Sequence, residues 1–232
     1  MKRLASAFQS DVRYQWRYGF YFIYGFLIVG FTVLIRLLPE DWRQTALTAV
    51  LLSDPALLGL FFIGGILQLE RGEGLLDALF LSPLRPWEYL VSKALSLGFL
   101  SALAGCLIAL GCGVPGVNFA LLAPVLLLGS ACFTLLGVSV SVNLKTMNAF
   151  LSVDGLWEAV LLTPPMLLLF GIGFVPLEVM PGSAVLRLVQ SSVAGSFPVW
   201  HGVCLLGWLA LAGFLAGRRL TAALCRLGGG AA

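Results

Sequence analysis

Long apolar runs separated by short polar stretches make up most of the chain. Each run approaches the roughly 20 apolar residues that a helix needs to cross the hydrocarbon core of a bilayer. Gly and Pro are frequent inside the runs, which is ordinary in membrane helices because small residues let helices pack closely. The pattern predicts an all-α integral membrane protein with six transmembrane helices, at residues 20–38, 50–68, 94–113, 119–142, 156–175 and 199–217.

The first residues follow a different pattern. Leu4, Phe8, Val12 and Trp16 recur every four residues, and polar residues occupy the other faces. This spacing predicts an amphipathic interfacial helix over residues 1–18, which either anchors the chain or takes part in gating. The polar residues ahead of the first apolar run also argue against a cleavable signal peptide.

Composition strengthens the membrane interpretation. Hydrophobic residues form 59% of the 232 residues, charged residues only 11%, and the mean hydropathy is +0.99. A soluble domain carries about 25% charged residues. We therefore treat residues 1–232 as a single transmembrane domain.

The distribution of Lys and Arg predicts orientation. With the N-terminus inside, eleven of the fourteen basic residues fall on the cytoplasmic side and three on the other. This is the bias expected for cytoplasmic loops, and an even number of crossings puts both termini in the cytoplasm. No block of basic residues is dense enough to indicate nucleic-acid binding.

The segment 176–198 is too short and too polar to be a seventh span, since Glu178, Arg187, Gln190 and Ser191 interrupt its apolar residues. We expect outer helices here, either a re-entrant pair or an external interfacial helix.

Motifs for catalysis are missing from the sequence. It contains no Gly-Lys pair and so no P-loop, and neither GxSxG nor HExxH occurs. The five cysteines form no CxxC motif, and one histidine, His201, cannot complete a metal site. We expect a transport protein without its own ATPase site, metal or cofactor, and not an intramembrane hydrolase.

Three acids, Asp54, Asp154 and Glu158, fall at predicted membrane depth, where a charge costs on the order of 2.5–3.5 kcal/mol. They either form interfacial ion pairs, for instance with Lys145, or Asp54 or Glu158 lines a translocation path that favours cationic or zwitterionic substrates. Pro55 after Asp54 predicts a break in the second helix.

The charged passage 70–92 stands between the second and third predicted spans. Apolar residues on one side of residues 74–81 predict a short amphipathic helix, and Pro83 ends it. This cytoplasmic segment is the place where soluble partners would bind.

The same passage resembles the membrane subunit of type-2 ABC exporters. That family typically has an acidic residue, Gly, alternating acidic and Leu positions, Pro, and a Lys that opens the next span. The matching residues here are Glu70, Glu73, Gly74, Leu76, Asp77, Leu79, Pro83 and Lys93, and Leu75 stands where Thr is common. Within that family the chain is similar to permeases described as fluoroquinolone exporters, through MKRLASAFQSDVRYQWRYGFYF, LLSDPALLGLFFIGG and the ERGEG passage.

The resemblance implies a permease of the bacterial inner membrane powered by separate cytoplasmic ABC ATPase subunits, which bind ATP and Mg²⁺. It also implies a second permease chain, identical or related, and outward movement of a drug-like, amphipathic or lipid-linked molecule by alternating access. The short helix would enter a groove of the ATPase, with apolar residues inserted and acidic residues at the rim. The residues expected to couple to the ATPase are Glu70, Glu73, Leu76, Asp77, Leu79 and Phe80.

Two alternatives stay open. A haem-exporter permease shares the six-span plan, although the single histidine argues against it. A stand-alone small channel or secondary carrier is a different class, which often shows internal repeats of spans, and we find none that is convincing.

Overall fold

The computed structural model describes residues 2–75, 85–144, 146–172, 175–194 and 198–229, and within these ranges it contains helices and no strand. Six of its helical stretches are long and apolar enough to cross a membrane. The prediction of an all-α membrane protein with six spans is confirmed.

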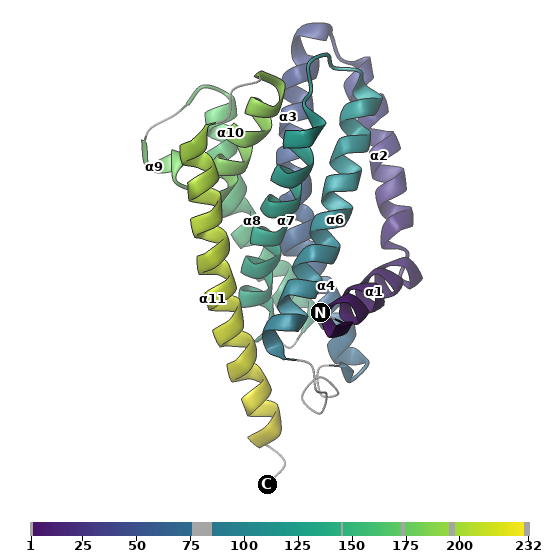
Figure 1. Ribbon diagram of the computed structural model, residues 1–232, viewed down its shortest axis with the longest axis vertical. Coiled ribbons are helices and arrows are strands. Elements are labelled where there is room, and N and C mark those ends of the chain that lie inside the picture. The colour runs from purple at the N-terminus through teal and green to yellow at the C-terminus, as the bar shows by residue number, and fades with distance from the viewer. Residues whose placement is uncertain (1, 76–84, 145, 173–174, 195–197, 230–232) are drawn as a thin grey trace.

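Five of the six candidate spans are continuous α-helices (Figure 1). They are α2 (Phe20–Leu37), α6 (Pro86–Cys112), α7 (Phe119–Ser141), α8 (Met147–Leu169) and α11 (Val199–Gly229). The remaining span consists of α3 (Glu40–Ala56), the π-helical turn η1 (Leu57–Phe62) and α4 (Ile63–Gly72). It is longer than the range 50–68 expected from hydropathy. The residues at both of its ends are more polar, so hydropathy does not count them as part of the span.

Pro55 lies inside α3, where its ring removes one backbone N–H from the hydrogen-bond ladder. The Asp54-Pro55 pair predicted a break in this helix, and that prediction is wrong. The chain stays helical and changes to wider π-type turns from Leu57, so the disturbance is absorbed within the span.

The N-terminal helix α1 (Lys2–Arg17) lies across one end of the bundle (Figure 1). Gly19 joins it to α2 with φ = 74°, a left-handed conformation that glycine adopts without the steric cost of a Cβ atom. The sharp corner at this glycine lets α1 turn away from the direction of the spans.

The end of the bundle that carries α1 also carries the last turn of α4, the first turn of α6 and the C-terminal part of α11; we call it the α1 end (Figure 1). The opposite end carries α9 (Val175–Glu178) and α10 (Pro181–Ala194). Buried residues occur on nearly every side of α10, which packs against α3, α7, α8 and α11. The carbonyl of Val179, just before α10, accepts hydrogen bonds from Trp208 Nε1 (2.7 Å) and Cys204 Sγ (3.2 Å) of α11.

The helix α8 begins nine residues before the expected span 156–175 and ends before its end. Thr146 caps its N-terminus, since its side-chain oxygen accepts a hydrogen bond from the Ala149 N–H. Gly171, with φ = 82°, follows its last turn. Polar residues in the first turns had hidden this start from a reading based on hydropathy.

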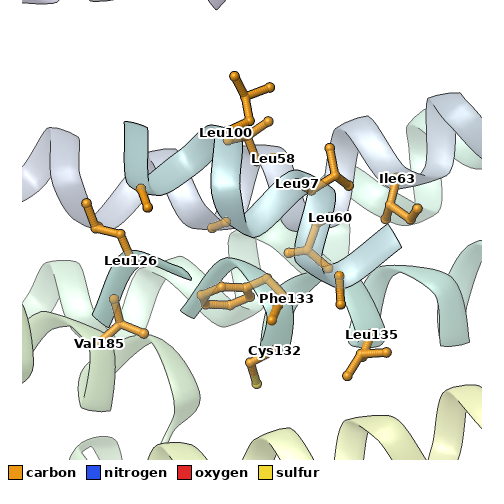
Figure 2. Close-up of a cluster of buried hydrophobic side chains, with 14 of the residues drawn as sticks. Leu58, Leu60, Ile63, Leu97, Leu100, Leu126, Cys132, Phe133, Leu135 and Val185 are labelled. Carbon is orange, nitrogen blue, oxygen red and sulfur yellow. The ribbon is translucent and has the colours of Figure 1, made fainter. Parts of the chain in front are cut away.

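The helix α7 lies at the centre of the bundle and packs against α3, η1, α4, α6, α8, α10 and α11. Figure 2 shows the core around Phe133 of α7, with leucines of η1 and α6 on one side and Val185 of α10 on another. Gly59 lets η1 pack directly against α7, because a Cβ atom there would lie 2.3 Å from Phe133 Cβ.

Three spans lie at the periphery. The most apolar stretches of α2, α8 and α11 are only 17–28% buried, whereas those of the other three spans are 56–71% buried. The outer faces of α2, α8 and α11 are therefore free to contact lipid or other chains.

Candidate functional site

The segment expected to couple to a partner begins where α4 ends. Glu70 lies in the last turn of α4, and Glu73 follows that helix directly. The other four expected coupling residues lie outside the described residues: Leu76, Asp77, Leu79 and Phe80. The two flanks of the segment, α4 and α6, are described, and they converge on one buried group.

That group is Lys93 of α6, whose side chain is almost completely buried. Its Nζ lies 2.6 Å from Asp11 Oδ1 of α1 and also forms an ion pair with Glu70 Oε1 of α4. Three elements far apart in sequence thus contribute one charge each. We call these residues the Lys93 centre.

Neighbouring side chains bind the carboxylate oxygens that do not pair with Lys93. The Tyr89 hydroxyl donates to Glu70 Oε2 at 2.5 Å, and the Ser92 hydroxyl donates to Asp11 Oδ2. Each of the four carboxylate oxygens therefore has a partner. This is the condition under which a buried ion pair is tolerated, because desolvation of unpaired charges costs several kcal/mol.

Aromatic side chains of α1 and α6 enclose the ammonium group. Lys93 Nζ lies 5.7 Å from the centre of the Tyr14 ring and 5.3 Å from that of Tyr89, within cation–π range. Burial, followed by the charges of Glu73 and Glu70, raises the pKa of Tyr14 to about 12. Tyr14 therefore stays protonated at physiological pH and adds no charge to the centre.

Two further contacts attach α1 to the flanks of the segment. Gln15 Nε2 donates to Ser96 Oγ of α6 at 3.0 Å, in the buried interior. The Tyr18 hydroxyl donates to Glu73 Oε1, at the point where the chain leaves α4. Gln15 of α1 thus contacts the α6 flank, and Tyr18, the residue after α1, contacts the α4 flank.

A second cluster connects α4 to the end of α7. The last carbonyls of a helix have no partner inside it and carry the negative end of the helix dipole. Arg71 donates to the carbonyls of Val142 (2.7 Å) and Leu144, and Gln68 donates to Leu144 at 2.8 Å. Arg219 of α11 donates to the carbonyl of Ser139 at 2.7 Å. The last turns of α4, which lead into the segment, are thereby joined to the end of the central helix α7.

The far flank of the segment starts a helix sharply. Pro86 occupies the first turn of α6, and the Arg85 N–H donates to Glu88 Oε2 at 2.9 Å. Both flanks are therefore fixed: one by the Lys93 centre and Arg71, the other by the Lys93 centre and this cap. Such an arrangement can transmit a displacement of the segment to α1 and α7.

Asp54 lies in the interior, away from the Lys93 centre. Ser101 of α6 donates to its Oδ2 at 2.9 Å, and the Tyr24 hydroxyl of α2 interacts with the same carboxyl group. The residue is 7% exposed and is surrounded by helices of a single chain.

Asp154 and Glu158 are one turn apart on α8, and their charges interact. Asp154 is fully buried, and neither of its oxygens has a hydrogen-bond partner among the described residues. Glu158 is half-buried on this peripheral helix. In the part of the chain that is described, no group of three His, Cys, Asp or Glu residues could hold a metal ion.

A family model described as the fluoroquinolones export permease protein family matches residues 2–208. The chain belongs to this family. The fluoroquinolones export permease proteins of Mycobacterium tuberculosis strains CDC 1551 / Oshkosh and ATCC 25618 / H37Rv are each 29% identical to it over 167 residues, which cover 71% of this chain and 70% of theirs. The predicted resemblance to such permeases is confirmed. The match to the family extends from α1 into α11 and includes the Lys93 centre.

Sequence reasoning placed Glu70 and Lys93 in the family pattern but did not pair them, and it missed Asp11 and Tyr89. One signal was available: Asp11 is the only acid in α1, and Gln15 follows it one turn later. Polar residues at this spacing on an otherwise apolar helix face indicate a buried polar contact.

Proposed function

We propose that the chain is the membrane-spanning permease subunit of an ATP-driven ABC exporter whose energy comes from separate cytoplasmic ATPase subunits. The observation that supports this most is the Lys93 centre, which ties both flanks of segment 70–92 to α1. A segment with such fixed flanks is suited to receive force from a partner. Membership in a family of export permeases supports the transport role.

Residues of the segment have different tasks in this proposal. Leu76, Leu79 and Phe80 insert into a groove of the ATPase, and Glu73 and Asp77 meet basic residues at its rim. Glu70 is buried and paired with Lys93, so we assign it a positioning role inside the permease.

Closure of ATP-bound ATPase subunits would displace the segment. Because α4, α6 and α1 share the Lys93 centre, they would move together, and Arg71 would carry the movement to α7. Interfaces of this kind switch between discrete arrangements and so support rocking between inward-facing and outward-facing states. Two permease chains, identical or related, would enclose the path, with the termini of each in the cytoplasm and the spans in the bacterial inner membrane.

The transported molecule is drug-like or amphipathic in this proposal. The tuberculosis relatives are named for fluoroquinolones, and we extend that class to this chain. Of the two acids predicted to line a path, Glu158 is the better placed, because it lies half-buried on peripheral α8, whereas Asp54 already has partners within the chain.

Copurification tests the coupling role. In cells that also produce the candidate ATPase, the double variant Leu79→Asp/Phe80→Asp is expected to lose the copurifying ATPase, because charged side chains cannot enter an apolar groove. The matched control is Phe170→Asp/Ile172→Asp, which changes two exposed apolar residues beyond the far end of α8.

The control variant should retain the ATPase and its stimulation by substrate. Retention of the ATPase by the double variant would contradict the proposed binding site. Substrate transport into liposomes by the purified chain alone would contradict the ABC mechanism and favour a stand-alone carrier.

A further inference from the structure

The outer surface of α1 divides into two stripes of opposite character. Residues at intervals of three or four form a polar, basic stripe that is exposed along its whole length: Arg3, Ser6, Ser10, Arg13 and Arg17. A second stripe is apolar and partly or fully exposed: Ala5, Phe8, Val12 and Trp16. A helix with these two neighbouring stripes is suited to lie at the boundary between headgroups and hydrocarbon.

Two arginines of the basic stripe, Arg13 and Arg17, lie one turn apart near the end of α1. Asp11, the only acid in α1, points inward to Lys93. Among the residues that the structure describes, neither Arg13 nor Arg17 forms an ion pair with an acid. Both arginines thus present positive charge at the surface without an ion-pair partner in the described part of the chain.

An apolar groove of about 470 Å³ opens beside the apolar stripe. Leu4, Ala5 and Phe8 of α1 line one wall, and Leu95 and Phe99 of α6 with Leu127 of α7 line the other. Along α6 the exposed apolar side chains continue from Leu95 through Phe99 and Leu103 to Leu107. This stripe covers about 18 Å of helix, roughly the depth of one leaflet.

The groove and the charges are close enough for one ligand. Phe8 lies about 7.5 Å of helix rise from Arg13 and about 140° away around the helix axis, with Val12 and Trp16 between them, so a lipid held by both would cross the apolar stripe from the groove to the arginine. We propose that α1 binds an anionic phospholipid of the surrounding bilayer, with its headgroup on Arg13 and Arg17 and one acyl chain in the groove and along α6.

The apolar stripe favours a lipid over an acidic protein surface as the occupant. Trp16 is 72% exposed directly beside the arginines, and an exposed tryptophan at a helix surface is typical of the headgroup layer. An acidic protein partner would account for the arginines but would leave the groove empty.

Binding is measured on the purified permease without any ATPase, so that the result is independent of the proposed coupling. The probes are dioleoyl phosphatidylglycerol and dioleoyl phosphatidylcholine, titrated into the detergent-solubilised protein and counted by native mass spectrometry. We expect phosphatidylglycerol to bind more tightly, and Arg13→Gln or Arg17→Gln to weaken it about five-fold each.

The matched control is Arg218→Gln, which removes an exposed arginine from the C-terminal half of α11. It should leave phosphatidylglycerol binding unchanged. Elution of all variants at the wild-type position on size exclusion shows that they are folded.

A groove variant tests the position of the acyl chain. Ala5→Trp fills the groove from an exposed position, so it should weaken binding of dioleoyl phosphatidylglycerol several-fold and leave that of the short-chain dihexanoyl lipid unchanged. An equal effect on both lipids would overturn the acyl-chain site.

Equal affinity for the two dioleoyl lipids, or an Arg13→Gln/Arg17→Gln double variant that binds phosphatidylglycerol like the control, would overturn the proposal. If that double variant keeps the lipid but loses a copurifying ATPase, the stripe serves a protein partner instead.

Discussion

A single lysine at the start of a membrane helix organises three elements of this permease. Lys93 is buried and pairs with two carboxylates, and hydrogen bonds from Tyr89 and Ser92 bind the remaining carboxylate oxygens. Such an ion pair adds little to the free energy of unfolding compared with an apolar cluster of equal volume. Breaking the pair is costly, because it would leave the carboxylate of Glu70 buried, and that of Asp11 partly buried, without a cation.

Replacement of Lys93 by Met tests this cost. The variant leaves Glu70 buried and Asp11 partly buried without their cation, so we expect the free energy of unfolding to fall by about 3–5 kcal/mol. Equilibrium unfolding of the detergent-solubilised protein measures it. Arg218→Gln, an exposed change, should stay within about 0.5 kcal/mol of the wild type.

The triple variant Asp11→Asn/Glu70→Gln/Lys93→Met separates charge from shape. With no ion left to desolvate, it should recover most of the stability that Lys93→Met loses. A triple variant as unstable as the single one would mean that packing of the lysine stem, and not its charge, holds the three elements together.

At the scale of elements, the position of α1 depends on the corner at Gly19. Its φ of 74° is left-handed, and a Cβ atom added there would meet no other atom within 4 Å. The requirement for glycine at this corner is therefore one of backbone conformation alone. Without the corner, α1 could not lie across the flanks of segment 70–92.

Gly19→Ala is expected to cost about 1–2 kcal/mol, the penalty for a Cβ atom in a left-handed conformation. Gly25→Ala is the matched control, because Gly25 lies inside α2, also with nothing within 4 Å of an added Cβ atom. Alanine is the better helix former there and should stabilise the protein by up to about 1 kcal/mol. Unfolding titrations compare the two, and equal effects would contradict the role of the corner.

Sequence reasoning reached the elements more easily than their contacts. Six spans and α1 follow from hydropathy and four-residue spacing, which depend on neighbouring residues only. The start of α8 was missed because Thr146 sets it by capping, a signal that hydropathy does not register. The Lys93 centre was missed because it joins residues 82 positions apart, and the pairing of Asp11 with Lys93 exists only after three helices have packed.

At the scale of the whole molecule, the two acids predicted to line a path have different surroundings. Asp54 is enclosed by α2, α3 and α6 of one chain, where its partners are Ser101 and Tyr24. Glu158 lies on α8, one of three spans that bury little of their surface. A path formed where two chains meet would pass the second acid and not the first.

Export of a cationic probe from cells or vesicles that also contain the ATPase distinguishes the two acids. Glu158→Gln should lower export of the cationic probe at least five-fold and leave export of a neutral analogue unchanged, because it removes charge without changing shape. Asp54→Asn, which keeps a hydrogen-bonding group for Ser101, should alter both probes alike. A Glu158→Gln variant that exports the cation normally would exclude this acid from the path.

The hydrogen bond to the carbonyl of Val179 makes movements at the end of the bundle opposite α1 detectable by tryptophan fluorescence. This carbonyl accepts a hydrogen bond from the indole N–H of Trp208, so the environment of this one chromophore depends on how α9 and α10 pack against α11. Separation of these elements would transfer that indole from a carbonyl partner to solvent or lipid and change its emission. With the other five tryptophans replaced by phenylalanine, the chain would carry one fluorescent reporter at the end of the bundle opposite α1.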